Sequence, residues 1–418
     1  MKKGFKKFIV CIFILAFSIV NVTACSDNSK VNEASEVPVI SIERVPGVAD
    51  YTKLFKDTTS LPHNDKYGQW ALDVRSSNLS SDNLMDRVDD LLYASFDSKT
   101  VWPDKLPEGF DPDKIMELYK DPGLNVRELH KKGITGKGVG IAIIDQCLLV
   151  DHIEYKDRLK YYEEYKDMKY GEHTSSMHGP AVASIAVGKS VGVAPEADLY
   201  YISGHFGDYD ENNNYIYDYT YTANDIKKII EINKTLPKNR KIRVISISLG
   251  FSNTEKGYDE FQEAVKLAEE NGIATLTTRM NYNNVKMVGM GRKPMTNGND
   301  FNDCCPGIFW MSNAKTVLNC KNLYIPMDFR CTAAPSGQED YAVYINGGFS
   351  WSVPYVAGAY ALACQVKPDI TFEEFFPKAY ETGKIIESNY KYYDEEIKLT
   401  MDKVISPVDL INKLQEEK

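Results

Sequence analysis

The stretch Gly-Phe-Ser-Trp-Ser-Val-Pro at residues 348–354 opens a run rich in alanine and glycine, which predicts a long buried helix over residues 350–364. A serine at the start of such a helix lies beside unpaired backbone N–H groups, which stabilise a developing negative charge. Pro354 is compatible with this position because a proline in the first helical turn removes no hydrogen bond. Ser350 is therefore a candidate nucleophile, although a serine at a helix start is more often only an N-cap.

Two upstream segments contain the partners that a nucleophilic serine needs. Residues 139–144 form an apolar run typical of a strand buried on both faces, and Asp145 follows it directly. His178 precedes a glycine and opens a small-residue run that predicts a helix over residues 178–187. An imidazole can accept the proton of a serine hydroxyl, and a carboxylate orients the imidazole. Each residue alone also has a plain structural interpretation, as a turn or loop residue.

Strand and helix patterns alternate along the chain between these segments. We expect strands at residues 139–144, 194–202, 244–248 and 273–277, and helices at residues 178–187, 222–236 and 258–271. This alternation predicts an α/β fold with a doubly wound, mostly parallel sheet and helices on both faces. Ligands of such folds bind at the carboxyl ends of the strands, where Asp145, Ser248 and Asn281 fall.

Together the three segments resemble those of the subtilisin-like serine peptidases, the subtilases of peptidase family S8. The resemblance covers about residues 126–385 and includes the small-residue stretches at residues 181–183, 192–195 and 356–358. It implies the subtilisin-like three-layer fold. It also implies a catalytic triad of Asp145, His178 and Ser350 that hydrolyses peptide bonds through an acyl-enzyme.

The resemblance implies two further site elements. Three residues match the segment that pairs with an extended substrate as an added strand: Ser248, Leu249 and Gly250. Asn281 aligns with the asparagine that donates a hydrogen bond to the oxyanion. Arg279 precedes it where the family has small residues, and Asn283 and Asn284 compete for the role. The alternative is an asparagine-rich surface turn.

Other positions depart from the family pattern without removing a catalytic atom. Cys147 replaces a glycine, Phe349 replaces a threonine, and Pro-Ala at residues 180–181 replaces Thr-His. These changes indicate a divergent member with altered packing and a narrower substrate range. His173 is a rival base, but no glycine or helix follows it, so we interpret it as a loop residue.

The N-terminus has the pattern of a targeting segment. Lysines precede an apolar run over residues 8–20, which is too short to span a bilayer and typical of a signal peptide. Val-Thr-Ala-Cys at residues 22–25 resembles a bacterial lipobox. We expect a lipoprotein signal peptide at residues 1–24, lipidation of Cys25, a flexible tether over residues 25–50 and a location on the extracytoplasmic face of a bacterial membrane. Ordinary secretion with cleavage near Ala24 is the alternative.

Residues 51–125 contain apolar residues typical of a folded segment: Trp70, Leu91, Leu92, Phe96 and Trp102. No linker separates this segment from the strand and helix pattern that begins at residue 126. We therefore expect an N-terminal extension that packs on a peptidase domain at residues 126–418. A propeptide removed on maturation is the alternative.

Composition limits the ligands of this chain. A net charge of −10 with interspersed lysine and glutamate argues against nucleic-acid binding.

Six cysteines remain once Cys11 and Cys25 are set aside, and none has the spacing of a zinc site. An extracytoplasmic location permits disulfides among residues 304–331, with buried thiols as the alternative. The acidic stretch at residues 208–214 lacks the glycine and distal glutamate of an EF-hand, so we expect neither metal nor cofactor.

These features predict a monomeric serine endopeptidase that acts on peptide or protein substrates at the cell surface. Two other classes stay open: a catalytically impaired subtilase-fold lipoprotein that binds peptides, and a solute-binding lipoprotein. A fluorophosphonate probe, which labels activated serines, distinguishes the three.

Overall fold

The computed structural model describes residues 37–43, 46–51, 72–165, 174–282, 284–308, 321–392 and 395–417. Glu36–Lys418 form one compact unit. The expected signal peptide, Cys25, Trp70, His173 and most of the expected tether lie outside the described residues.

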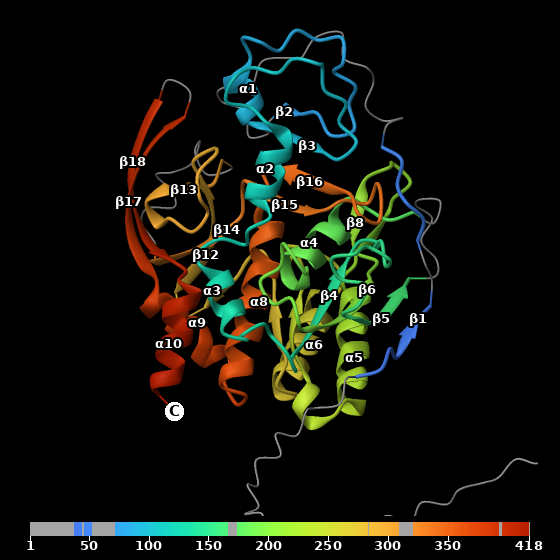
Figure 1. Cartoon of the computed structure of the whole chain (residues 1–418). Helices are drawn as coiled ribbons and strands as arrows, with labels where there is room; N and C mark the ends of the chain where they lie inside the picture. The colour runs from blue at the N-terminus through green and yellow to red at the C-terminus, as the bar shows by residue number, and fades with distance from the viewer. Residues whose placement is uncertain are drawn as a thin grey trace, which may run out of the picture. The chain divides into compact units, whose positions relative to one another are not determined.

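A six-stranded parallel sheet lies at the centre of this unit (Figure 1). Its order is β1-β5-β6-β4-β9-β10, and every neighbouring pair is parallel. The strands are β1 (Ser41–Ile42), β5 (Leu159–Glu164), β6 (Asp198–Ser203), β4 (Gly140–Asp145), β9 (Ile242–Ser246) and β10 (Ala274–Leu276). Because β4 lies between β6 and β9, the residue that ends β4 emerges from the middle of the sheet.

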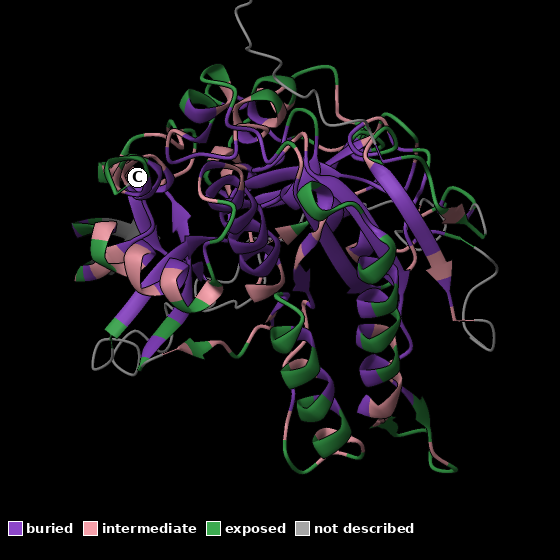
Figure 2. Ribbon diagram, turned by 90° about the horizontal axis from the view of Figure 1, so that it is seen from below, coloured by how far each residue is buried: buried purple, intermediate pink, exposed green. Residues whose placement is uncertain are grey.

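Helices cover both faces of this sheet, as the alternating pattern predicted. Residues 141 and 143 of β4 pack into one apolar cluster with α4 (His178–Val187) and α8 (Phe349–Val366). Residues 142 and 144 pack into a second cluster with α5 (Tyr219–Thr235) and α6 (Tyr258–Glu270). Successive side chains of a strand point to opposite faces, so a continuous apolar strand is buried from both sides. Figure 2 shows the resulting purple core and the green outer sides of the helices. The mixed α/β class is confirmed.

Two further sheets and a hairpin complete the β-structure, and the sequence pattern did not predict them. The second sheet has the order β11-β12-β14-β18-β17 with β13 beside β12, and the third has the order β15-β16-β3-β2. The strands of the second sheet are β11 (Asn281–Tyr282), β12 (Val285–Arg292), β13 (Cys304–Pro306), β14 (Lys321–Pro326), β17 (Lys384–Tyr392) and β18 (Glu395–Val404). Those of the third are β2 (Leu72–Asp73), β3 (Ala94–Asp97), β15 (Arg330–Ala333) and β16 (Tyr341–Tyr344), and the hairpin is β7 (Gly207–Tyr209) with β8 (Tyr215–Tyr217).

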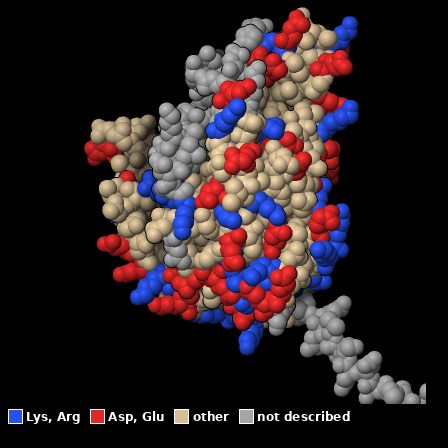
Figure 3. Space-filling model, turned by 90° about the vertical axis from the view of Figure 1, so that its left-hand side faces the viewer, with Lys and Arg blue, Asp and Glu red and all other residues tan. Residues whose placement is uncertain are grey.

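The remaining helices lie around these sheets. Within the described residues they are α1 (Val88–Leu92), α2 (Pro112–Tyr119), α3 (Val126–Lys131), α9 (Phe372–Thr382) and α10 (Pro407–Glu416), with 3₁₀ turns η1 (Lys238–Arg240) and η2 (Phe301–Asp303). Among the described residues, no helix is long and apolar enough to cross a bilayer. On the face in Figure 3, acidic and basic side chains intermingle without a continuous basic stripe.

Predicted and observed element bounds agree within a few residues, with two instructive differences. The strand expected at residues 194–202 begins only at Asp198, because residues 194–197 form a turn in which the Ala197 N–H donates to the carbonyl of Ala194. The helix expected from residue 222 begins at Tyr219, because the Asp218 carboxylate accepts a hydrogen bond from the Thr220 N–H and caps the helix.

The cysteines at residues 304–331 do not form the expected disulfide among the described residues. Cys304, Cys305 and Cys331 are buried free thiols, and Cys320 lies outside the described residues. Burial raises the pKa of Cys304 to about 12. Cys304 and Cys331 belong to different apolar clusters, which explains why the two do not meet.

Candidate active site

Asp145 and His178 meet at the carboxyl end of the central sheet. The carboxylate Oδ1 of Asp145, the last residue of β4, lies 2.6 Å from Nδ1 of His178, the first residue of α4. Gly179 permits this approach, because a Cβ there would lie 2.6 Å from the carbonyl oxygen of Gln146. The Gln146 N–H also donates to Asp145 Oδ1. The carboxylate therefore holds the imidazole in one orientation and leaves Nε2 for a substrate or a nucleophile.

Ser350 occupies the second position of α8, next to Ser248. The Ser350 hydroxyl donates to the Ser248 carbonyl at 3.4 Å, and the Ser248 hydroxyl donates to the Ser350 carbonyl at 2.9 Å. Trp351, which follows Ser350, packs its ring edge-on against the His178 imidazole at 5.2 Å between centroids. Ser248 and Trp351 thus link the region of Ser350 to the Asp145–His178 pair.

Two opposing effects determine the pKa of the His178 imidazole. Burial lowers its pKa, whereas the charge of Asp145 and the hydrogen bond to it raise the pKa, and the net result is above the ordinary value. An imidazole of this kind accepts a proton from serine and stays stable as the imidazolium. Asp145 therefore increases the basicity of His178 as well as orienting it.

A cleft of about 620 Å³ opens beside these residues. Asp145 and His178 line one part of it, and Ser248 and Leu249 line another. Its remaining wall contains aromatic residues of the β7–β8 segment: Phe206, Tyr209, Tyr215 and Tyr217. The sequence pattern did not assign these residues to the site. The alternation of Tyr215 and Tyr217 around an exposed Ile216 is the signal that could have identified them, because alternate residues of a strand share a face.

The acidic stretch at residues 208–214 covers the end of β7 and the turn of this hairpin. The Asp210 carboxylate accepts hydrogen bonds from the backbone N–H groups of Asn212 and Asn214. Within the described part of the chain, no group of three or more potential metal-ligating side chains occurs.

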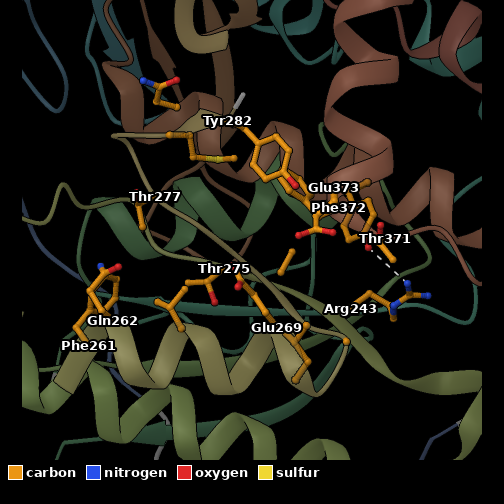
Figure 4. A pocket seen from close by; sticks show the side chains of 17 residues that line it. Arg243, Phe261, Gln262, Glu269, Thr275, Thr277, Tyr282, Thr371, Phe372 and Glu373 are labelled. Atoms are coloured by element: carbon orange, nitrogen blue, oxygen red, sulfur yellow. Dashed lines mark hydrogen bonds between the residues drawn. The ribbon is translucent and has the colours of Figure 1, made fainter. Parts of the chain in front are cut away.

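Asn281 lies in a different pocket from Asp145 and His178. It belongs to β11 and lines a second cavity of about 380 Å³, shown in Figure 4, between the edge strand β10, α6 and the start of α9. A tight hairpin follows, in which Asn281 pairs with Lys286 and Asn284 adopts a left-handed conformation. This short connection carries Asn281 into the second sheet. Its oxyanion role stays a prediction.

The three residues expected to pair with substrate are not equivalent in the structure. Ser248 and Leu249 line the cleft beside Asp145 and His178, whereas Gly250 faces Arg279. A Cβ at Gly250 would lie 3.0 Å from Arg279 Nε, and Arg279 Nη1 donates to the Phe251 carbonyl at 3.2 Å. The Arg279 side chain therefore covers the end of the expected substrate strand.

Comparison with known proteins supports the resemblance. Residues 136–292 match the subtilase family, a range that includes Asp145 and His178 and ends before Ser350. The chain is 26% identical over 178 residues to the major intracellular serine protease of Bacillus subtilis (strain 168), which covers 40% of this chain and 47% of that protein. It is 25% identical over 300 residues to a subtilisin-like protease of Coccidioides posadasii (strain C735), covering 65% of this chain and 64% of that protein.

The aligned regions thus span about half to two-thirds of the length of these curated relatives. Among solved structures, the prenylagaramide maturation protease PagA matches with 15% identity and a TM-score of 0.44, covering 70% of this chain and 99% of that chain. The chain therefore contains a subtilase family domain match and has weak homology to subtilisin-like proteases.

Proposed function

We propose that this chain is a serine endopeptidase in which Asp145, His178 and Ser350 hydrolyse peptide bonds through an acyl-enzyme. The subtilase family domain implies serine protease activity. The observation that carries the triad assignment is the 2.6 Å hydrogen bond between Asp145 and His178, beside a serine at the start of α8. Each part of this arrangement has a role in acyl transfer.

In the proposed reaction, His178 Nε2 accepts the proton of Ser350 as the oxygen attacks the scissile carbonyl. The carbonyl π electrons move to oxygen, and the N–H groups at the start of α8 stabilise this oxyanion. Collapse of the intermediate breaks the C–N bond, and His178 donates its proton to the leaving amine. Water then attacks the acyl-enzyme by the same route in reverse, with His178 again as the base.

A fluorophosphonate probe tests this proposal directly. We expect covalent labelling of the wild-type protein, because an activated serine displaces the fluoride and an unactivated serine does not. Prior incubation with a peptide substrate should slow the labelling. An unlabelled but folded protein would instead support the peptide-binding alternative.

We expect kcat/KM to fall at acid pH as His178 becomes protonated, with a midpoint above the ordinary pKa of histidine. Asp145→Asn removes the charge that raises this pKa and leaves the burial that lowers it, so the midpoint should move to lower pH. The rate should also fall by about 10⁴-fold. Gln146→Ala, a change at the exposed neighbouring side chain, is the control and should keep the wild-type midpoint. The measurement is the pH–rate profile, and an unchanged midpoint in Asp145→Asn would contradict the pairing.

We further propose that the tyrosines of the β7–β8 hairpin select apolar or aromatic side chains near the scissile bond. Tyr209 and Tyr215 pack edge-on at 5.1 Å between centroids, as do Tyr215 and Tyr217, and all three line the cleft. Such a surface favours apolar and aromatic groups by burial and ring stacking.

Tyr215→Ala should therefore lower kcat/KM for peptides with an aromatic residue at the selected position by about 10- to 100-fold. Peptides with a small polar residue there should change little. Ile216→Ala is the matched control, because Ile216 is 47% exposed and lies on the opposite side of the same strand. A substrate library measures both variants, and equal losses for all peptides would contradict selection by the hairpin.

The proposed cellular location is the extracytoplasmic face of a bacterial membrane, through a lipid on Cys25. The support is the lysine-rich start, the apolar run and the Val-Thr-Ala-Cys motif at residues 22–25. Acyl chains contribute about 0.8 kcal/mol per buried CH₂ group to membrane attachment. Cys25→Ser should therefore release the protein from membranes or block its processing, whereas Ser26→Ala should not. Membrane fractionation measures the release, and the intact mass of the protein measures its processing. A Cys25→Ser protein found wholly on membranes at wild-type mass would refute the anchor.

A further inference from the structure

Two arginines lie buried side by side, away from the catalytic cleft. Arg292 ends β12 and is 8% exposed, and Arg330 begins β15 and is 3% exposed. Both line a pocket of about 30 Å³ that also contacts the segment at residues 121–124. Guanidinium groups stay charged at neutral pH, so this pocket has two cations in its wall.

Several donors at this place have no acceptor. Arg292 Nη2 donates to the Phe329 carbonyl at 2.8 Å, but within the described part of the chain Arg292 Nε and Arg330 Nε and Nη1 are buried without a hydrogen-bond partner. The Tyr355 hydroxyl is also buried and unpartnered, and the Arg330 guanidinium lies 5.4 Å from its ring centre. The unsatisfied groups are thus all able to donate, and most belong to cations.

The carboxylates that line the pocket are engaged elsewhere. Asp121, Asp300 and Asp328 are present, but among the described residues neither arginine forms an ion pair with them. Asp121 accepts hydrogen bonds from the Gly123 N–H and Asn299 Nδ2 and forms an ion pair with Arg127. Asp300 accepts hydrogen bonds from the N–H and Nδ2 of Asn302. Asp328 accepts hydrogen bonds from the N–H groups of Ile308 and Gly347. Burial raises the pKa of Asp328 to about 7, so this carboxyl is only partly charged at neutral pH. These carboxylates therefore accept none of the hydrogen bonds that Arg292 Nε and Arg330 Nε and Nη1 could donate.

Arg240, another buried arginine of the same chain, has a carboxylate partner. Arg240 Nε and Nη2 each donate to the Asp198 carboxylate at 3.0 Å. A buried charge without a partner is strongly unfavourable, and paired geometry offsets that cost. The unpartnered donors of Arg292 and Arg330 lack such an acceptor, which an anion from solvent can supply.

We propose that Arg292 and Arg330 bind a monovalent anion of halide size, such as chloride, in the pocket between them. The pocket volume of about 30 Å³ has room for about two water molecules. This space suits a halide and excludes a phosphate ester. The ion joins β12 to β15 and lies near Tyr355 on α8, the helix that begins at the proposed nucleophile. Its function is structural: it stabilises the packing behind α8 whether or not the chain is a peptidase.

Thermal unfolding of the full chain in sodium chloride, against sodium gluconate of equal ionic strength, tests the site. An ion that binds only the folded state raises stability with its concentration, and gluconate is too large to enter. We expect Tm to rise by about 2–4 °C for each tenfold increase in chloride above its Kd, beyond any change in gluconate. Bromide should act like chloride. Identical curves in chloride and gluconate would overturn the proposal.

Two variants separate ion binding from general destabilisation. Arg330→Met removes one cation at similar volume and should abolish the chloride-dependent part of Tm. Arg240→Met, the control at a buried arginine with a carboxylate partner, should lower Tm and keep the chloride-dependent part. A chloride response of wild-type size in Arg330→Met would overturn the proposal.

Direct detection does not depend on the stability of a variant. Crystals of the wild-type protein grown in bromide should give an anomalous peak within hydrogen-bonding distance of Arg330 Nε or Nη1 and of Arg292 Nε. Density for water alone at this position would refute the anion site.

Discussion

Replacing Ser350 with alanine is expected to lower kcat by about 10⁶-fold and to abolish fluorophosphonate labelling, because the change removes only the oxygen that forms the acyl-enzyme. Ser350 is half-buried at the start of α8, and its hydroxyl makes one hydrogen bond at 3.4 Å, to Ser248. Its loss should therefore leave Tm nearly unchanged. Peptide hydrolysis, labelling and thermal unfolding of the same preparation measure the three quantities.

A second serine on the same helix provides the matched control. Ser352 is fully buried, and its hydroxyl lies 3.5 Å from the Ile325 carbonyl and 3.4 Å from the Pro326 carbonyl, on the side of α8 that faces β14. Ser352→Ala should keep labelling and most of the activity. Labelling that persists in Ser350→Ala, or is lost in Ser352→Ala instead, would show that the nucleophile was assigned to the wrong serine.

The sequence was sufficient to predict β4, β6, β9 and β10 of the central sheet and to bring Asp145 next to His178, but it did not predict β1 and β5. The apolar strand ending at Asp145 is buried on both faces, and its neighbours follow it as parallel strands joined by helices, so chain order restricts the topology. The glycine after His178 has a direct physical reason, because no side chain fits between α4 and the turn after β4. Such local constraints are visible in a single sequence.

The rest of the site depends on connections that a sequence pattern does not specify. Asn281 has the spacing of an oxyanion donor, yet the tight hairpin at Asn284 leads it into the second sheet and the pocket of Figure 4. The sequence pattern did not assign the hairpin tyrosines to the site, because nothing in the sequence places β7 and β8 beside Asp145 and His178. The arginines 292 and 330 are far apart in sequence, and only the folded chain brings their guanidinium groups into one pocket.

The segment at residues 72–119 packs directly against β15 and β16. Its β3 lies beside β16 (Figure 1) and pairs with it, and its apolar side chains share a cluster with residues of β15 and β16. Arg75 donates to the Tyr344 hydroxyl at 2.8 Å, Tyr344 packs on Trp351 at 5.1 Å, and Trp351 packs on His178. A series of direct contacts therefore connects this segment to the proposed base.

The stability of the folded chain should depend strongly on Phe96, which lies in this cluster. Its ring is fully buried and packs edge-on against Trp102 at 5.5 Å and Phe110 at 6.1 Å between centroids. Phe96→Ala should lower the free energy of unfolding by about 3–5 kcal/mol, through lost burial and the cavity that is left. Val101→Ala, at a nearby residue that is 49% exposed, should change it by less than about 0.5 kcal/mol. Urea denaturation of both variants measures the difference.

Deleting the segment should have a still larger effect. A chain that begins at residue 126 lacks β2 and β3, exposes the edge of β16 and uncovers the apolar cluster, so we expect it to aggregate or to stay unfolded. A chain that begins at residue 37 keeps the whole cluster and should fold. Intact mass of the active species gives the decisive comparison. Because Tyr344 and Trp351 connect the segment to His178, an active mature form that starts near residue 126 would mean that the segment is a removable propeptide and that these contacts are not required for catalysis.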